Sequence, residues 1–164
     1  MKSILVRYSL GLLVVLGSGF FSFLFLPLTL YTSYFLLKIF TDVQLVGSTL
    51  SLASGSFAFI SACAASLAYV LLLLLLLFTR GISFVQGAKM FLFGGSMIFL
   101  LNIFRILFLI GIYVNYGKNY FDLVHIFFWH FVSTIFVAGV WIFLVERYKI
   151  RAIPLVSDIR ELLR

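Results

Sequence analysis

The sequence predicts an all-α integral membrane protein with about four transmembrane helices, an interfacial helix and a short extracytoplasmic hairpin. Hydrophobic residues make up 64% of the 164 positions and charged residues only 10%, whereas roughly a quarter of the residues of a soluble domain are charged. The apolar residues are collected in long runs, and a helix that crosses a bilayer needs about 20 of them. A chain of this length therefore has room for four such helices and for little else.

The first predicted span runs from Tyr8 to Leu26. It follows Lys2 and Arg7, and no small-residue cleavage site comes after it, so we expect an uncleaved anchor and not a signal peptide. Proline disrupts the interior of a helix, because it lacks an N–H group and clashes with the preceding turn. Pro27 is therefore expected to end this span.

Two shorter segments follow the proline. The apolar piece from Pro27 to Phe40 is too short for a full crossing, so it is predicted to be an interfacial or re-entrant helix. From Val43 to Phe59, apolar residues are separated by glycine, serine and threonine. This pattern is typical of short strands or a hairpin outside the hydrocarbon layer.

Three further spans are predicted in the rest of the chain: Ile60 to Phe78, Val85 to Tyr113 and Asp122 to Val145. The second is longer than a bilayer requires and should be tilted, and Asp122 is placed as the carboxylate at the start of the last helix. Residues 149–164 mix apolar and charged positions, which predicts an amphipathic tail on the cytoplasmic surface. We therefore divide the chain into a membrane-embedded core, residues 1–148, and this tail.

The formal net charge of +7 does not indicate a nucleic-acid partner. Most basic residues lie at the ends of apolar runs, where lysine and arginine set the orientation of membrane helices. With both termini in the cytoplasm, Lys38 and Lys118 are the only basic residues expected on the opposite face. We therefore expect a multi-pass protein of a prokaryotic plasma membrane, surrounded by membrane lipids, with its hairpin outside the cytoplasm.

Among the polar residues of these apolar runs, a thiol, an amide, a guanidinium and two imidazoles require an explanation: Cys63, Asn102, Arg105, His125 and His130. Ionisable groups in hydrocarbon cost free energy and usually mark a function. Counting about 1.5 Å per helical residue places all of them in the outer half of the bilayer. Asn102 lies one turn before Arg105 on the same helical face and can orient its guanidinium. The two histidines are five residues apart and face different directions, so only one of them should line a shared site.

Each of these groups also has a simpler interpretation when it is taken alone. Cysteine is often a small packing residue, and the run Ala62-Cys63-Ala64 makes good helix-packing surface. Gly94-Gly95-Ser96 is predicted to serve helix packing in the same way. One cysteine with one histidine falls short of a zinc site, so we expect no metal and no cofactor.

Taken together, the thiol, guanidinium and imidazole match the requirements of cysteine-based acyl transfer. A nearby cation favours the thiolate, which is the nucleophile. An imidazole can donate a proton to a leaving amine, and a fixed guanidinium can hold the oxyanion of a tetrahedral intermediate. The sequence therefore predicts such a site at the extracytoplasmic face.

From Pro27 to Val145 the chain resembles the exosortase/archaeosortase family of membrane cysteine transpeptidases. The resemblance rests on motifs that follow one another in family order, and each is short. They are the Pro27-led segment with Thr32 and Leu36-Leu37, the hairpin from Val46-Gly47 to Leu52, the helix start Ala62-Cys63, the motif Asn102-x-x-Arg105-Ile106, and the histidine helix. The family commonly has serine or threonine and then glycine after the cysteine, where this chain has Ala64-Ala65.

The resemblance implies roles for the polar residues. Cys63 would be the nucleophile and Arg105 the stabilising cation. His130 would transfer the proton, because His130-Phe131-Val132-Ser133 resembles the family's histidine motif, and His125 is the alternative. Asn102 would support the site.

The implied activity is cleavage of the C-terminal sorting signals of exported proteins. Such a signal consists of a short motif, a hydrophobic helix and basic residues, and the enzyme would pass the acyl group to a lipid or another surface acceptor. The rival hypothesis is a non-catalytic assembly partner, in which Arg105 pairs with a carboxylate of another subunit. A small multidrug-type transporter would need an acidic residue inside a span, and the sequence has none there.

Overall fold

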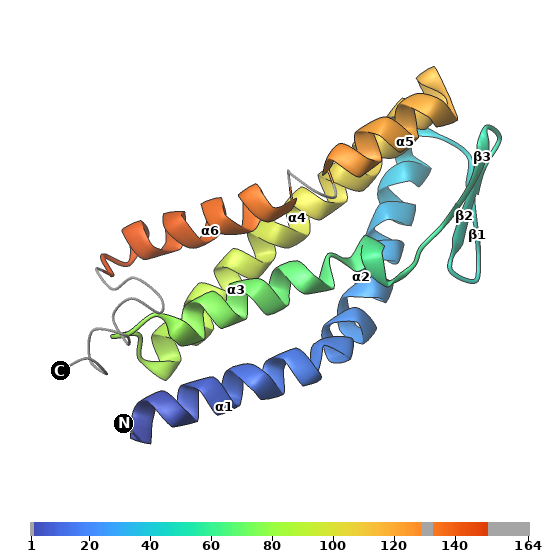
Figure 1. Ribbon diagram of the computed structural model, residues 1–164. Coiled ribbons are helices and arrows are strands. Elements are labelled where there is room, and N and C mark those ends of the chain that lie inside the picture. The colour runs from blue at the N-terminus through green and yellow to red at the C-terminus, as the bar shows by residue number, and fades with distance from the viewer. Residues whose placement is uncertain (1, 129–132, 151–164) are drawn as a thin grey trace.

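The computed structural model describes residues 2–128 and 133–150, and this part of the chain is mostly helical with one small sheet (Figure 1). The predicted combination of long helices with a short β-hairpin region is thereby confirmed. The elements in chain order are α1 (Lys2–Leu16), α2 (Ser18–Phe40), β1 (Val43–Val46), β2 (Thr49–Leu52), β3 (Gly55–Ala58), the 3₁₀ helix η1 (Ser61–Ala64), α3 (Ser66–Phe78), α4 (Phe84–Tyr116), α5 (Lys118–Phe127) and α6 (Ser133–Arg147).

The described helices pass back and forth along one long direction (Figure 1). α1 and α2 run outward, α3 returns, α4 runs outward again, and α5 and α6 return. The start of α1, the α3–α4 connection and the end of α6 consequently lie at one end of the body. The sheet and the α4–α5 junction lie at the other.

Two of these helices, α2 and α4, are long and apolar enough to cross a membrane. Only 22% of the most apolar window of α2 and 33% of that of α4 are buried inside the protein. Most residues of these two windows are therefore not buried, which differs from the core helix of a soluble domain. The apolar helices α1 and α3 are shorter than a full crossing requires.

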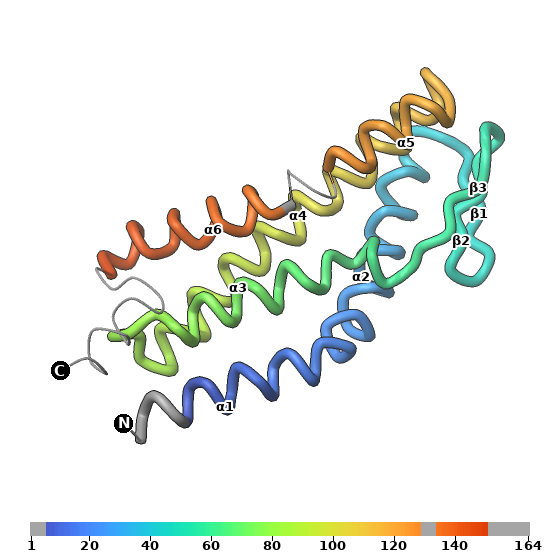
Figure 2. The backbone as a smooth tube through the Cα atoms, viewed as in Figure 1, coloured from blue at the N-terminus to red at the C-terminus, as the bar shows by residue number. Residues whose placement is uncertain are grey.

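The first break in the helical chain lies at Gly17, and the prediction that Pro27 ends a helix is wrong. Pro27 lies inside α2, which continues to Phe40, so the segment after the proline is the second half of a 23-residue helix and not a separate interfacial piece. Figure 2 shows the chain changing direction between α1 and α2. A proline inside an apolar helix is tolerated where neighbouring elements compensate for the lost hydrogen bond.

The three strands form an antiparallel meander in the order β1-β2-β3. Val46 pairs with Thr49 and Leu52 with Gly55, so each connection has two residues. Gly47 in the first connection has φ 61°, in the left-handed region that favours glycine. Leu50 on the central strand is completely buried against α2 and α4, which holds the sheet on the helices.

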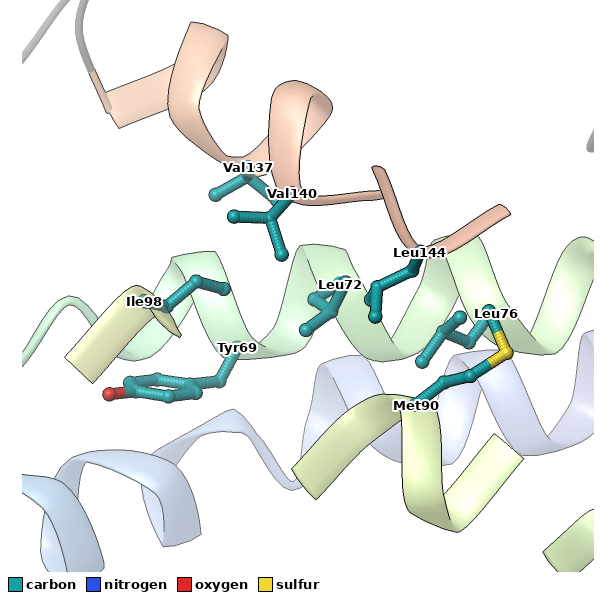
Figure 3. Close-up of a cluster of buried hydrophobic side chains, with 8 residues drawn as sticks. All are labelled: Tyr69, Leu72, Leu76, Met90, Ile98, Val137, Val140 and Leu144. Carbon is teal, nitrogen blue, oxygen red and sulfur yellow. The ribbon is translucent and has the colours of Figure 1, made fainter. Parts of the chain in front are cut away.

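The main apolar core joins α3, α4 and α6. Figure 3 shows its eight buried side chains: Tyr69, Leu72, Leu76, Met90, Ile98, Val137, Val140 and Leu144. Gly94 of α4 allows this close packing, because a Cβ atom there would lie 2.8 Å from Leu144 and 2.9 Å from Leu72. The predicted packing role of this glycine is confirmed.

Two helices begin at residues other than those predicted. α3 begins at Ser66 and not at Ile60, because the residues before it form strand β3 and η1. The helix expected to start at Asp122 begins at Lys118, directly after Gly117, whose φ of 81° ends α4. Asp122 lies one turn later and pairs with the Lys118 ammonium. The described part of this region consists of α5 and α6, and the predicted tail lies outside the described residues beyond residue 150.

Candidate functional site

Cys63 lies in the 3₁₀ helix η1, between strand β3 and helix α3. Its backbone N–H donates to the carbonyl of Ile60 at 2.8 Å, and Ala64 beside it is completely buried. The prediction that Cys63 belongs to the first turn of a long helix is wrong, because Ala65 separates η1 from α3. The thiol is therefore presented by a short turn and not by a helix face.

Ala65 adopts φ 51° and ψ 30°, the left-handed conformation. For a residue with a Cβ atom this conformation costs about 1–2 kcal/mol. It is also the position at which the resembled family commonly has glycine. The alanine here thus occupies a backbone geometry suited to glycine, and the structure accommodates it at the cost of strain.

Asn102 of α4 holds the backbone of this turn. Its Nδ2 donates to the carbonyl oxygen of Cys63 at 2.7 Å, and the residue is only 5% exposed. Its Oδ1 is buried and has no hydrogen-bond partner among the described residues. The amide oxygen therefore accepts nothing from the Arg105 guanidinium, contrary to the predicted orienting role, and the amide nitrogen instead links α4 to the turn that carries Cys63.

Arg105 lies one turn further along α4 and is half-buried. Its Nε atom is buried and makes no hydrogen bond to any described residue. The guanidinium interacts electrostatically with the Cys63 thiol. The packing of η1 and α4 therefore brings the predicted nucleophile and the predicted cation, which are 42 positions apart in the sequence, into the same region.

His125 of α5 lies near the same arginine. The imidazole is half-buried and interacts electrostatically with Arg105. Its ring packs edge-on against Phe121 at 5.3 Å between centroids, and Phe121 in turn contacts Tyr113 of α4 at 5.7 Å. These aromatic contacts fix the position of α5 against α4. His130, the other candidate, lies outside the described residues.

Two cavities adjoin Arg105. The larger, about 470 Å³, extends between the start of α2, η1, α3 and α6, and its walls are mostly small or hydroxyl-bearing residues. Its lining consists of Ser18, Gly19, Ser22, Ser61, Ala62, Ala65, Ser66, Leu67, Ala68, Leu71, Arg105, Thr134 and Val137. The smaller, about 250 Å³, is more apolar and is lined by Ala65, Ala68, Ile98, Leu101, Asn102, Phe104, Arg105, Phe128, Phe136 and Val137.

Cys63 itself lines neither cavity, although Ala62 and Ala65 on either side of it do. The cysteine is half-buried and packs against an apolar cluster that includes Leu50 and Ile106. The thiol thus lies at the boundary between this cluster and the cavity region.

Two buried hydroxyl groups on α2, close to the η1 turn, were not predicted from the sequence. Thr29 and Ser33 are completely buried on α2, which packs against η1, and neither hydroxyl oxygen has a hydrogen-bond partner among the described residues. They are four residues apart and therefore share one face of the helix. A pair of hydroxyl residues at helical spacing inside an apolar run is the signal that could have identified them.

Within residues 2–128 and 133–150, histidine, cysteine, aspartate and glutamate side chains do not gather in groups of three that could hold a metal ion. Comparison of the chain with protein-family models, with curated proteins and with solved structures finds no match. Function is therefore inferred from the chemistry of the residues around Arg105.

Proposed function

We propose that this protein is a membrane cysteine transpeptidase, similar to the exosortase/archaeosortase family, that cleaves C-terminal sorting signals of exported proteins. The observation that carries the proposal is the 2.7 Å hydrogen bond from Asn102 to the Cys63 carbonyl, because it joins the turn that bears the thiol to the helix that bears Arg105 one turn further on. A thiol, an imidazole and a half-buried guanidinium from three different elements are the groups that acyl transfer needs. Nothing in a purely packed interface requires this combination.

In the proposed reaction, the Cys63 thiolate attacks the carbonyl carbon of the scissile peptide bond. A carbon–sulfur bond forms, and the negative charge that develops on the carbonyl oxygen is stabilised by the Arg105 guanidinium. The carbon–nitrogen bond then breaks as an imidazolium gives its proton to the leaving amine. An amine or hydroxyl of a lipid or another surface acceptor finally attacks the thioester and releases the thiol.

Two histidines are candidates for the proton transfer. His125 is supported by the aromatic packing of its ring on Phe121, which holds α5 against α4. His130 is supported by its resemblance to the family motif and by its greater expected depth in the bilayer. We keep His130 as the first choice and His125 as the alternative, and separate substitutions distinguish them.

We further propose a multi-pass arrangement in a prokaryotic plasma membrane, with four crossings and the site on the extracytoplasmic side. Large apolar side chains are exposed on every long helix, as expected for lipid contact. The α3–α4 connection with Arg80, the first turns of α4 with Lys89 and the end of α6 with Arg147 lie toward the end of the body where α1 starts (Figure 1). The end of α2 with Lys38 and the start of α5 with Lys118 lie toward the sheet end. This charge difference supports a cytoplasmic position for the first end.

The length of α3 supports a site inside the outer half of the bilayer. Its 13 residues span about 20 Å at about 1.5 Å per residue. The hydrocarbon core is about 30 Å thick. With the α3–α4 connection at the inner boundary, the turn that carries Cys63 lies about two thirds of the way across, where a hydrophobic signal helix could bring its adjoining motif.

An assembly partner remains the second candidate, because the Nε atom of Arg105 is buried and has no hydrogen-bond partner among the described residues. A carboxylate from another subunit would satisfy it. In that case Arg105 would be essential for association and the sulfur of Cys63 would be dispensable. The two hypotheses therefore differ in the response to a change at Cys63.

A precursor-processing assay tests the proposal. A precursor with a C-terminal sorting signal, encoded in the same genome, is expressed with each variant, and the cleaved and uncleaved forms are compared. We expect Cys63→Ala and Arg105→Lys to leave the precursor uncleaved, because lysine cannot reproduce the planar guanidinium. His125→Ala and His130→Ala in the same assay identify the proton-transfer group. Normal cleavage by Cys63→Ala would favour the assembly-partner hypothesis.

A further inference from the structure

The turn that carries Cys63 has few hydrogen bonds of its own. Cys63 N–H bonds the carbonyl of Ile60 at 2.8 Å, and Ala65 N–H approaches the carbonyl of Ala62 only to 3.5 Å. The last carbonyl groups of any helix have no partner within it. Asn102 supplies such a partner from another element, because its Nδ2 bonds the Cys63 carbonyl at 2.7 Å.

The same helix that supplies this amide also supplies the cation. Asn102 and Arg105 are three residues apart on α4 and therefore lie on one side of it. A hydrogen bond from Asn102 to the Cys63 backbone thus sets the position of the thiol relative to the guanidinium. Sites built on regular elements hold their groups more accurately than sites built on loops.

We propose that Asn102 is a positioning residue for Cys63, which fixes the η1 turn so that the sulfur and the Arg105 guanidinium keep the spacing that attack on a carbonyl requires. This inference rests on the proposed transpeptidase function. It assigns Asn102 a contact with the nucleophile's backbone, and not the guanidinium-orienting role that its sequence spacing suggested.

A packing role alone does not account for this amide. Asn102 is buried, and its Oδ1 has no hydrogen-bond partner among the described residues. Burying a polar atom without a partner costs free energy, so an apolar side chain of similar size would serve packing better. The hydrogen bond from Asn102 to the Cys63 carbonyl therefore explains why an amide is present at this buried position.

The test uses the full-length protein and the variant Asn102→Leu, which removes the donor and keeps a similar volume. Asn115→Leu is the matched control, because Asn115 also lies on α4 but donates only within its own helix, to Gly111 at 2.8 Å. Three quantities are measured for each: the kcat and KM of precursor cleavage, the rate at which a neutral maleimide alkylates Cys63 in detergent, and the thermal unfolding midpoint.

For Asn102→Leu we expect kcat to fall about 10- to 100-fold, as for a misplacement of about 1 Å, while KM stays within about twofold. The alkylation rate should change at least severalfold, and Asn115→Leu should match the wild type in every measurement. Asn102→Gln keeps the amide donor and should recover part of the lost kcat. If Asn102→Leu has the same kcat and the same alkylation rate as the wild-type protein, the positioning role is wrong.

Two further outcomes are decided by the same measurements. If Asn102→Leu does not fold, Asn102→Asp replaces it, because this variant keeps the size and shape but has no N–H to donate, and the same changes in kcat and alkylation are required. If wild-type protein cleaves no precursor, the transpeptidase function is wrong. In that case, an alkylation rate in Asn102→Leu equal to that of the wild type also excludes the positioning role. A changed alkylation rate would show that Asn102 positions the η1 turn, without a role in catalysis.

Discussion

Helix α4 takes part in two regions of different character. Around Gly94 it meets α3 and α6 in an apolar core in which the side chains are in close contact (Figure 3). About two turns further on, around Asn102 and Arg105, it meets η1 beside two cavities, with buried polar atoms that no described residue satisfies. The first region is arranged for stability. The second keeps two cavities and a strained residue, Ala65, and backbone strain is common where a protein carries out chemistry.

This difference predicts opposite responses to added and removed atoms. A larger side chain should harm the packed core, whereas relief of strain near Cys63 should increase stability. The following two substitutions test these expectations, beginning with the larger effect.

Gly94→Leu should destabilise the protein by about 1–3 kcal/mol, because overpacking a close-packed core forces neighbouring side chains to move. Even a Cβ atom would lie 2.8 Å from Leu144 and 2.9 Å from Leu72, both of which are completely buried. Gly111→Leu is the control on the same helix, because a Cβ atom there meets nothing within 4 Å. Thermal unfolding in detergent measures both, and equal midpoints would show that this core is not closely packed.

Ala65→Gly should stabilise the protein by about 0.5–1 kcal/mol. Glycine removes the cost of the left-handed conformation at φ 51°, and the greater freedom of glycine in the unfolded chain offsets part of the gain. Ala68→Gly inside α3 is the control and should destabilise by about 1 kcal/mol. The same unfolding experiment measures both variants, and a loss of stability in Ala65→Gly would mean that the turn is not strained.

Much of the fold follows from hydrophobic runs and glycine signals. The extent of α4, the β-hairpin region between Val43 and Phe59, and the packing role of Gly94 could be predicted, because each depends on local pattern. The helix through Pro27 could not be predicted, because its tolerance depends on neighbouring elements. The position of Cys63 in a 3₁₀ turn could not be predicted either, since the left-handed conformation of Ala65 is unusual for alanine.

The candidate site shows the same limits. Sequence alone identified Cys63, Arg105 and His125 as polar groups that require an explanation, and the structure places Arg105 within electrostatic reach of each of the other two. The sequence did not reveal the hydrogen-bond partner of Asn102, because a contact between residues 39 positions apart depends on how η1 packs against α4. His130 lies outside the described residues, so its assignment stays a prediction.

The covalent state of Cys63 during turnover tests the central claim most directly. Wild-type protein expressed with a precursor that carries a C-terminal sorting signal is trapped by rapid denaturation, and the intact mass is measured. The proposed mechanism predicts a thioester adduct on Cys63 that hydroxylamine removes, and no thioester in Cys63→Ser, whose hydroxyl is a far weaker nucleophile at neutral pH. Full precursor cleavage by Cys63→Ser, with no adduct on the wild type, would contradict it.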